Sequence, residues 1–387
     1  MQLFITGVTG FLGGEVLVNL AARKEIEKIY CLVRIKDGEA DPKARLRKIF
    51  ELHNDHYDAN KIELIEGNLT DEDLVIKLKA DPRLKNIDHV IHSAANTSFS
   101  GIYNDLIDKV NIQGLKSLLT WAESLEVMNK FVYIGTATIC GKDVLHRMVH
   151  EDESPNLQAS HLVRYTYSKM MGELMVREML PKEKILILRP SIIMGDSRPV
   201  FPRSPVILWT LATANLIRLL PIAPDSALDV IPVDYAAKAI TALLFAKRRF
   251  DTYHISAGTP SVSTPFKLAK AIEAFYPERP AFKFIDQKML NPIKIWSKKG
   301  EDKNNHLADF TEYTSYWSSV FNENGQLRIL LAGMEPYFGF LSLGQTFNND
   351  RLLADTTIGA PPPAHQYILS SRSYLDKINI LEAALDP

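Results

Sequence analysis

The sequence predicts an α/β protein with a doubly wound parallel sheet, and three observations point to this class. Short apolar runs alternate with longer amphipathic runs through the first half of the 387 residues. A glycine-rich turn follows the first apolar run, and two further apolar runs appear in the second half. Regular alternation of strands with helices is typical of a parallel sheet covered by helices on both faces.

The expected strands are short runs rich in β-branched and aromatic residues. They cover 3–6, 29–34, 62–67, 89–95, 131–136, 184–193 and 252–258. The expected helices carry apolar residues at helical spacing. They cover 13–25, 41–52, 71–80, 104–125 and 165–179. Each of the first five expected strands is followed by an expected helix, and parallel strands require such crossover connections.

The overall composition excludes several classes of protein. The formal charge of −1 shows no acidic or basic bias, so no nucleic-acid partner and no polybasic membrane patch are expected. Only two cysteines occur, Cys31 and Cys140, which is too few for a disulfide framework and fits a reducing compartment. Met1 is followed almost at once by a strand, so no signal peptide and a cytoplasmic location are expected.

The apolar segment 206–220 raises the question of a membrane. It is shorter than a spanning helix and carries Asn215 and Arg218, so it does not qualify as a transmembrane segment. We expect a helix buried inside the protein that lines a pocket. Peripheral contact with a membrane surface is the less favoured alternative.

Three glycines lie between the first strand and the first helix. Gly7, Gly10 and Gly13 form a G-x-x-G-x-x-G spacing in "TGVTGFLGG". Such a loop turns tightly and brings backbone N–H groups and the positive end of a helix up to a pyrophosphate. Because the loop heads a series of strand–helix–strand units, it predicts a Rossmann-type dinucleotide-binding domain.

The end of the second strand indicates the choice of coenzyme. Sites for NAD usually place an acid there to bind the ribose 2′-hydroxyl, but this strand ends in "CLVR", with Arg34 at that place. A guanidinium suits a 2′-phosphate, and Arg45 and Arg47 on the next helix add positive charge. NADPH is therefore favoured over NADH, although the nearby Asp37 keeps NADH open.

A tyrosine and a lysine are the candidate catalytic pair. Tyr165 and Lys169 are four residues apart on an expected helix, which places both side chains on one face. An ammonium beside a phenol favours the phenolate, so we expect the pKa of Tyr165 to be lowered toward working pH. Tyr165 could then exchange a proton with a carbonyl oxygen, while Lys169 reaches the nicotinamide ribose. Tyr167 is only two residues from Lys169 and is expected to point away.

A threonine completes this candidate site. Thr136, with Thr138 nearby, follows the fifth strand in "YIGTATICG". Ligands bind at the carboxyl ends of parallel strands, so the Thr136 hydroxyl is placed to donate to a substrate oxygen. The combination of glycine loop, threonine and tyrosine–lysine pair predicts a hydride-transferring enzyme.

Histidines do not add a convincing metal site. His53 and His56 are three residues apart in "HNDHYD", but no cysteine or distant third ligand joins them, so no metal is expected. His92 lies in a predicted strand and is interpreted as a packing residue.

The order of these motifs resembles the extended short-chain dehydrogenases/reductases. More narrowly, the chain is similar to fatty acyl-CoA reductases and to the terminal thioester-reductase domains of carboxylic acid reductases and peptide synthetases, over residues 1–258. The stretches that carry this resemblance are "TGVTGFLGG", "YCLVR", "HSAANTSF", "NIQG", "ILRPSIIMG" and "LDVIPVDYAAKAI".

The resemblance implies roles for individual residues. The pyrophosphate would be held by Gly7, Thr9, Gly10, Phe11, Leu12 and Gly13. The rest of the coenzyme would contact Arg34, Asn68, Leu69, Ser93, Ala94, Ala95, Tyr165, Lys169, Pro190, Ser191 and Ile192. Asn111 would support the active-site water or the lysine. Two positions depart from the family pattern: Asn68 stands where an aspartate is frequent, and Gly135 stands where a serine precedes the threonine.

The predicted organisation is a coenzyme domain over 1–195 and 228–258, with a smaller, irregular, mainly helical substrate-binding subdomain over 196–227 and 259–387. The predicted activity is NADPH-dependent reduction of an acyl thioester, on CoA or on the phosphopantetheine arm of a carrier protein. An aldehyde would be the first product, and an alcohol would need a second hydride. A nucleotide-sugar epimerase or dehydratase, a hydroxysteroid-type dehydrogenase and a non-catalytic NADP-binding regulator remain alternatives, and the oligomeric state is left open.

Overall fold

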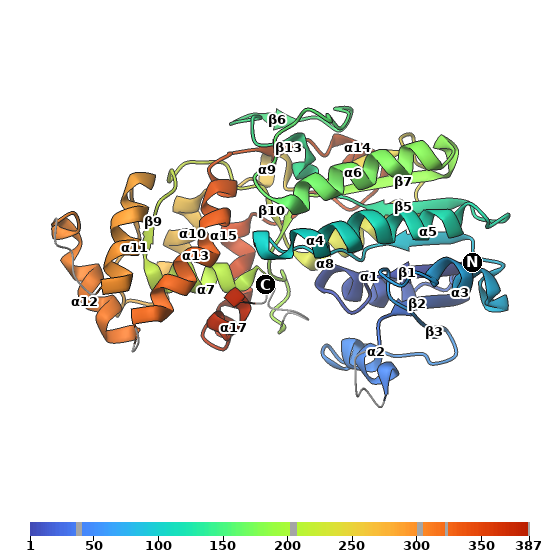
Figure 1. Cartoon of the computed structure of the whole chain (residues 1–387), viewed down its shortest axis with the longest axis horizontal. Helices are drawn as coiled ribbons and strands as arrows, with labels where there is room; N and C mark the ends of the chain where they lie inside the picture. The colour runs from blue at the N-terminus through green and yellow to red at the C-terminus, as the bar shows by residue number, and fades with distance from the viewer. Residues whose placement is uncertain (36–40, 202–206, 300–304, 322–323, 386–387) are drawn as a thin grey trace.

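The computed structural model describes residues 1–35, 41–201, 207–299, 305–321 and 324–385. Asp37 and residue 206, which the sequence interpretation used, lie outside these ranges. Within them, a parallel sheet forms one half of the molecule and a group of helices forms the other (Figure 1).

Seven parallel strands form the central sheet, as the sequence predicted. They are β1 (Gln2–Thr6), β2 (Lys28–Val33), β3 (Ile62–Glu66), β4 (His89–His92), β5 (Lys130–Ile134), β7 (Ile185–Pro190) and β11 (Thr252–Ile255). Their order is β11-β7-β5-β4-β1-β2-β3, so the direction of winding reverses between β1 and β4. Ligands bind in open α/β sheets at the carboxyl ends of the strands beside such a reversal.

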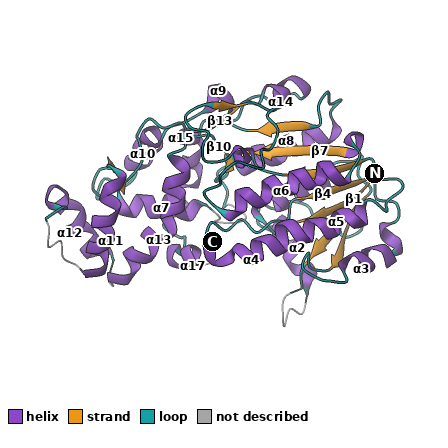
Figure 2. Ribbon diagram, turned by 45° about the horizontal axis from the view of Figure 1, so that its top comes forward, coloured by secondary structure: helices purple, strands orange, loops and turns teal. Residues whose placement is uncertain are grey.

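Helices cover both faces of this sheet (Figure 2). On one face lie α1 (Phe11–Ala21), α2 (Pro42–Glu51) and α8 (Val233–Phe245); on the other lie α3 (Leu74–Ala80), α5 (Leu115–Ala122) and α6 (Arg164–Met179). Side chains alternate between the two cores along each strand: Leu3 and Ile5 pack on the first face, and Phe4 packs on the second. Near-continuous apolar strands follow from this double burial.

The single helix expected over 104–125 is wrong in detail. The chain forms α4 (Asn104–Ile107), a π-helical stretch over Asp108–Gly114 and then α5. Gly114 packs so closely on Leu69 that a Cβ would lie 2.7 Å from the Leu69 Cβ. Single π-helical turns interrupt helices at functional sites more often than elsewhere, and this one contains Asn111.

The other half of the molecule is mainly helical. Its elements are α7 (Leu208–Ile217), α10 (Pro265–Glu273), α11 (Leu290–Lys299), α12 (Thr311–Val320), α13 (Asn324–Leu341), α15 (Ala364–Tyr367), α16 (Arg372–Leu375) and α17 (Ile380–Leu385). In the described ranges, three short strand pairs lie outside the central sheet: β8 (Ile192–Ile193) with β10 (Val230–Ile231), β9 (Leu219–Leu220) with β12 (Lys283–Phe284), and β6 (Met148–Val149) with β13 (Thr346–Phe347). A further short helix, α9 (Gly258–Ser261), follows β11.

The apolar segment singled out in the sequence forms α7, which is buried as expected. Arg218 ends the helix in the left-handed conformation at φ 62° and is fully buried. Its guanidinium donates to Asn215 Oδ1 at 2.7 Å and to the Pro280 carbonyl at 3.0 Å. In the described part of the chain, no helix is both long and apolar enough to cross a membrane.

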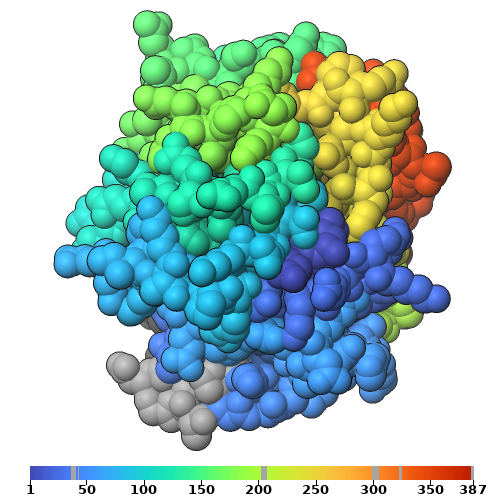
Figure 3. Space-filling model, turned by 90° about the vertical axis from the view of Figure 1, so that its right-hand side faces the viewer, coloured from blue at the N-terminus to red at the C-terminus, as the bar shows by residue number. Residues whose placement is uncertain are grey.

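The C-terminal part of the chain returns to the sheet, which the sequence did not predict. There α14 (Asp350–Asp355) packs against α8 and β11, and its orange-red surface borders the yellow surface at the sheet edge (Figure 3). Two buried carboxylates bind the backbone of this C-terminal segment. Asp229 accepts from the Phe347 N–H at 2.9 Å, and Glu151 accepts from the Arg351 N–H at 3.0 Å. Burial raises the pKa of Glu151 to about 7.

Candidate active site

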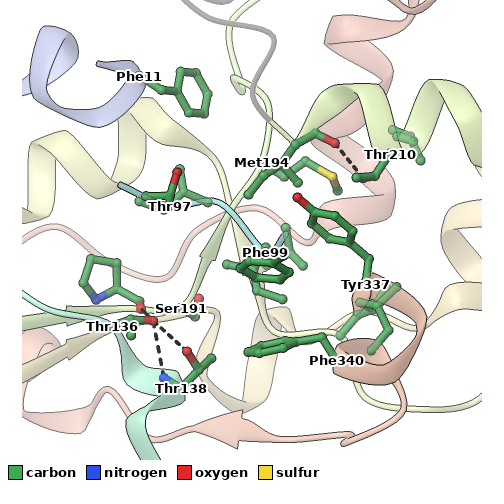
Figure 4. Close-up of a pocket in the computed structure, with 18 of the residues that line it drawn as sticks. Phe11, Thr97, Phe99, Thr136, Thr138, Ser191, Met194, Thr210, Tyr337 and Phe340 are labelled. Atoms are coloured by element: carbon green, nitrogen blue, oxygen red, sulfur yellow. Dashed lines mark hydrogen bonds between the residues drawn. The ribbon is translucent and has the colours of Figure 1, made fainter. Parts of the chain in front are cut away.

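One cavity of about 380 Å³ opens at the carboxyl ends of the central strands and extends between the helices of the other half (Figure 4). Most of the residues that the sequence singled out line it together. They are Gly7, Gly10, Phe11, Leu12, Gly13, Ser93, Ala95, Thr136, Tyr165, Lys169, Pro190, Ser191 and Ile192. Segments far apart in the chain therefore converge on one site.

The glycine loop is shaped by close backbone contacts. Gly7 has φ +78°, and a Cβ there would lie 2.5 Å from the Ala94 backbone nitrogen. A Cβ on Gly13 would lie 2.1 Å from the Gly7 carbonyl oxygen, so no larger residue fits either position. Gly10 donates to the same carbonyl at 3.0 Å, and α1 begins directly after it. This cradle beside a helix N-terminus suits a dinucleotide pyrophosphate. Thr9 is exposed at the turn and does not line the cavity.

The residues expected at the far end of the coenzyme lie outside the cavity. Arg34 follows β2 and is exposed, and its carbonyl accepts a hydrogen bond from Arg45. Arg47 pairs with Asp41 at the start of α2, so its charge is already engaged within the protein. Arg34 therefore lies exposed at the end of β2, outside the cavity.

Three further predicted residues are structural neighbours of the loop and not part of the cavity wall. Asn68 accepts from the Thr70 N–H at 3.3 Å, Leu69 is buried against Gly114, and Ala94 lies beneath Gly7. Their backbones follow β3 and β4 at the same edge of the sheet as the glycine loop.

Thr136 lies just past β5 with its hydroxyl held in place. Its Oγ1 is 2.9 Å from Thr138 Oγ1 and 3.3 Å from the Pro190 carbonyl, to which it donates. Thr138 also lines the cavity, and Figure 4 shows both hydroxyls beside Ser191. Two adjacent hydroxyls at one strand end form a small polar region that can donate to a substrate oxygen.

Tyr165 and Lys169 lie on α6 and line the same cavity, as their spacing predicted. The expected electrostatics are wrong for the protein alone. Burial raises the pKa of the Tyr165 phenol and lowers the pKa of the Lys169 ammonium to about 7. The lysine Nζ lies 4.7 Å from the centre of the Tyr133 ring. The sequence spacing predicts correctly that both side chains line one cavity. It carries no information about the free-energy cost of removing two ionisable groups from water.

The side chain of Asn111 joins the loop after β4 to α6. It does not line the cavity, and it donates from Nδ2 to the Asn96 carbonyl and to Ser168 Oγ, both at 2.9 Å. Its Oδ1 accepts from the Asn96 N–H at 2.7 Å. Ser168 in turn donates to the Tyr165 carbonyl at 2.7 Å. Asn111 therefore fixes the 93–100 loop against α6, which makes it a positioning residue.

The sequence missed the aromatic wall of the site. Phe99 stacks on Tyr337 with ring centres 4.7 Å apart and lies 5.4 Å from Phe340. Both partners come from α13, and Trp209 on α7 meets Tyr337 edge-on at 5.5 Å. The scattered aromatics of the C-terminal half were the available signal, but their sequence distance from Phe99 concealed the contact.

The other histidines and the tyrosine that the sequence singled out lie outside the cavity wall. His92 is buried, its Nδ1 lies 2.9 Å from Thr6 Oγ1, and burial lowers its pKa to about 3. Tyr167 stacks beneath Arg164 at 4.3 Å, away from the cavity. His53 lies 2.8 Å from the Phe201 carbonyl. Over the described ranges, no group of three potential metal ligands converges.

Comparison with known proteins agrees with this geometry. The model of the male sterility protein family matches residues 5–240. Fatty acyl-CoA reductase 1 of Xenopus laevis is 27% identical over 278 residues, which are 62% of this chain and 54% of that protein. The chain thus spans about half the length of this relative.

Two solved structures share the fold. The terminal R domain from the myxalamid PKS-NRPS biosynthetic pathway superimposes with a TM-score of 0.72 at 24% identity, over 99% of this chain and 92% of that one. UDP-glucuronic acid 4-epimerase from Bacillus cereus, in complex with NAD, gives a TM-score of 0.63 at 15% identity, over 97% of this chain and 99% of the epimerase. At these identities the likeness concerns the fold.

Proposed function

Because the chain belongs to the male sterility protein family, whose model describes an NAD-binding domain, we propose that it is an oxidoreductase that reduces an acyl thioester with NADPH. The observation that carries the proposal is the continuity of one cavity, which runs from the glycine loop past Thr136, Tyr165 and Lys169 into an apolar region. A reductase needs a coenzyme, a proton donor and an apolar acyl chain to meet in such a space.

The coenzyme fits the residues present. The glycine cradle admits a pyrophosphate, and Ser93, Ala94 and Ala95 follow β4 beside it. Pro190, Ser191 and Ile192 form the wall that would face the nicotinamide. NADPH is favoured because Arg34 stands at the end of β2 where a 2′-phosphate would be recognised, with Asn68 and Leu69 near the adenine.

The proposed chemistry divides the work between coenzyme and protein. NADPH, when bound, would supply a hydride to the thioester carbonyl carbon. Thr136 and Tyr165 donate hydrogen bonds to the carbonyl oxygen as negative charge develops there. Tyr165 protonates that oxygen, and collapse of the hemithioacetal releases an aldehyde and a thiol. Lys169 holds the nicotinamide ribose, and Asn111 keeps the surrounding loop and α6 in register. A second hydride would take the aldehyde to the alcohol.

Organisation, partners and location follow from the same proposal. Residues 1–195 and 228–258 would hold the coenzyme, and residues 196–227 and 259–387 would bind the acyl group. The thiol would belong to CoA or to a carrier-protein phosphopantetheine, as fits the thiolation-reductase di-domain among the similar structures. The two free cysteines, Cys31 and Cys140, fit the reducing environment of a cytoplasm.

The epimerase structure gives the rival activity its support, since nucleotide-sugar epimerases share the fold. Among the described residues that line the cavity, however, Lys169 alone carries a charge. A nucleotide sugar would bring a second diphosphate and several hydroxyls into a region that offers few partners for them. The acyl thioester suits this lining better.

The test uses the purified chain with NADPH and either acyl-CoA or acylated carrier protein, while nicotinamide absorbance and thiol release are followed together. Tyr165→Phe is expected to lower kcat by roughly a hundredfold or more and to leave NADPH binding intact. Tyr167→Phe is the matched control on the same helix and is expected to keep full activity. Turnover of UDP- or dTDP-sugars without thiol release would contradict the proposal.

A non-catalytic, NADP-binding regulator is the rival of another class. It predicts that Tyr165→Phe keeps both coenzyme binding and the biological role of the chain, whereas a reductase loses that role with its activity. Complementation of a deletion strain by the variant distinguishes the two.

A further inference from the structure

The cavity continues beyond the candidate catalytic residues as an apolar chamber, defined here as the part walled by α7, α10 and α13. Each helix contributes buried apolar side chains to it: Trp209 and Leu211 from α7, Leu268 and Ile272 from α10, and Met334 and Phe338 from α13. These side chains are suited to a hydrocarbon chain, while Thr210 on α7 and Tyr337 on α13 also bring hydroxyl groups to the lining.

Side chains of the aromatic wall lie between this chamber and the candidate catalytic residues. Phe99 lies 6.2 Å from Tyr165 on one side, with the rings 29° from parallel, and stacks on Tyr337 on the other. Figure 4 shows Phe99 between the Thr136 region and the α13 side chains Tyr337 and Phe340. A chain that starts at a carbonyl held by Thr136 and Tyr165 would therefore pass along Phe99 into the chamber.

Phe282 also lines the chamber, and its half-buried ring is held on several sides. The ring packs against the apolar clusters on both sides of the chamber, and the Arg218 guanidinium lies 4.4 Å from its centre. Its backbone N–H donates to Glu273 Oε2 at 2.9 Å, at the end of α10. Phe282 directly precedes β12, which pairs with β9, and Figure 1 places β9 on the opposite side of α10 from the central sheet.

We propose that the apolar chamber holds the acyl chain of the thioester substrate and that Phe282 forms its floor, setting the longest chain accepted. This inference rests on the proposed function for the identity of the chain. Each methylene buried in the chamber improves binding by about fourfold. A methylene beyond the floor adds nothing, so binding plotted against chain length rises and then stops at a limit.

Two substitutions move that limit in opposite directions. Phe282→Ala removes the floor and extends the limit to longer chains. Ala269 lines the cavity one helical turn before Glu273, so Ala269→Phe fills the space in front of the floor and moves the limit to shorter chains. Phe266→Ala is the matched control, because that phenylalanine also lies on α10 but is 49% exposed and outside the cavity.

Two measurements separate this inference from the proposed activity. The first is reduction of a series of acyl-CoAs from hexanoyl to palmitoyl. The second needs no catalysis: displacement of the fluorescent fatty acid cis-parinaric acid by saturated fatty acids of the same lengths. We expect the longest accepted chain to become longer in Phe282→Ala and shorter in Ala269→Phe. At the longest chains tested, reduction and probe displacement should change by at least tenfold, in opposite directions in the two variants. Phe266→Ala should behave as the wild type does.

Wild-type reduction of thioesters with no change of the limit in either variant would overturn the role of Phe282 and leave the proposed activity standing. Displacement of the probe without reduction of any thioester would overturn the activity, and the shifts in displacement would still decide the role of the chamber. If Phe282→Ala does not fold, Ala269→Phe decides, because a limit that stays in place in that variant contradicts the inference.

Discussion

Glu173 on α6 and Arg189 on β7 form an ion pair that is almost fully excluded from solvent. Arg189 Nε lies 2.8 Å from Glu173 Oε2, and Nη2 lies 2.7 Å from Oε1. Glu173 comes one helical turn after Lys169, and Arg189 directly precedes Pro190. The pair therefore joins the helix that carries Tyr165 and Lys169 to the strand end that forms the opposite wall of the site.

Removal of Arg189 is expected to destabilise the fold. Arg189→Met leaves a buried carboxylate that retains only Arg177 as a cationic partner, so we expect the free energy of unfolding to fall by about 3 kcal/mol. Urea denaturation measures the change. Lys77→Ala, which breaks an exposed pair with Asp73, serves as the control and is expected to cost less than about 1 kcal/mol. Equal losses in the two variants would contradict the prediction.

Lys169 is expected to make stability rise with pH. Burial lowers the pKa of its ammonium to about 7, against 10.5 for an ordinary lysine. Between these values the unfolded chain keeps a proton that the folded chain has released, so the folded state gains stability as pH rises. Below about pH 7 both states are protonated and the full cost of burying the charge is present.

Lys169→Met removes this dependence. The difference in free energy of unfolding between wild type and variant should change with pH above 7, by at most about 1.4 kcal/mol per pH unit. Urea denaturation across a pH series measures it. Lys182→Met, at a lysine whose side chain is 87% exposed, is the control for the loss of a lysine outside the protein interior. A flat difference for Lys169→Met would show that its burial carries no such cost.

Gly13→Ala is expected to weaken coenzyme binding while the chain still folds. The added Cβ would meet the Gly7 carbonyl at 2.1 Å, which forces the loop open just where a pyrophosphate would lie. We expect NADPH affinity to fall by roughly tenfold or more, measured by nicotinamide fluorescence. Gly325→Ala on α13 is the control, because its Cβ meets nothing within 4 Å. Unchanged affinity in Gly13→Ala would place the coenzyme elsewhere.

Arg34 tests the choice of coenzyme. Its loss removes a charge-assisted contact with a 2′-phosphate, so Arg34→Ala should weaken NADPH binding by roughly ten- to a hundredfold and leave NADH binding nearly unchanged. Titration of both coenzymes into both proteins measures this. Arg83→Ala, at a distant arginine paired with Asp81, controls for loss of net charge. An equal loss for NADPH and NADH would exclude the proposed contact.

Most of the sheet and half of the site could be predicted because the signals are local. The runs around Leu3, Ile29 and Phe131 are largely apolar because both faces of a parallel strand are buried. Likewise, the roles of Gly7 and Gly13 could be predicted because only glycine fits the close backbone contacts at these positions. The helical run expected through Asn111 is present, but its π-helical turn and the bonds of Asn111 to Asn96 and Ser168 were not predicted, because those partners lie in other segments.

The sequence by itself determined the parallel sheet, the glycine cradle and the shared helix face of Tyr165 and Lys169, because each depends on neighbours within a few residues. Only the tertiary structure decided that Phe99 meets Tyr337, that Phe282 lines the same cavity as Trp209, and that burial shifts the pKa values of Tyr165 and Lys169. These depend on which distant segments exclude water from one another, and no local pattern of residues encodes that.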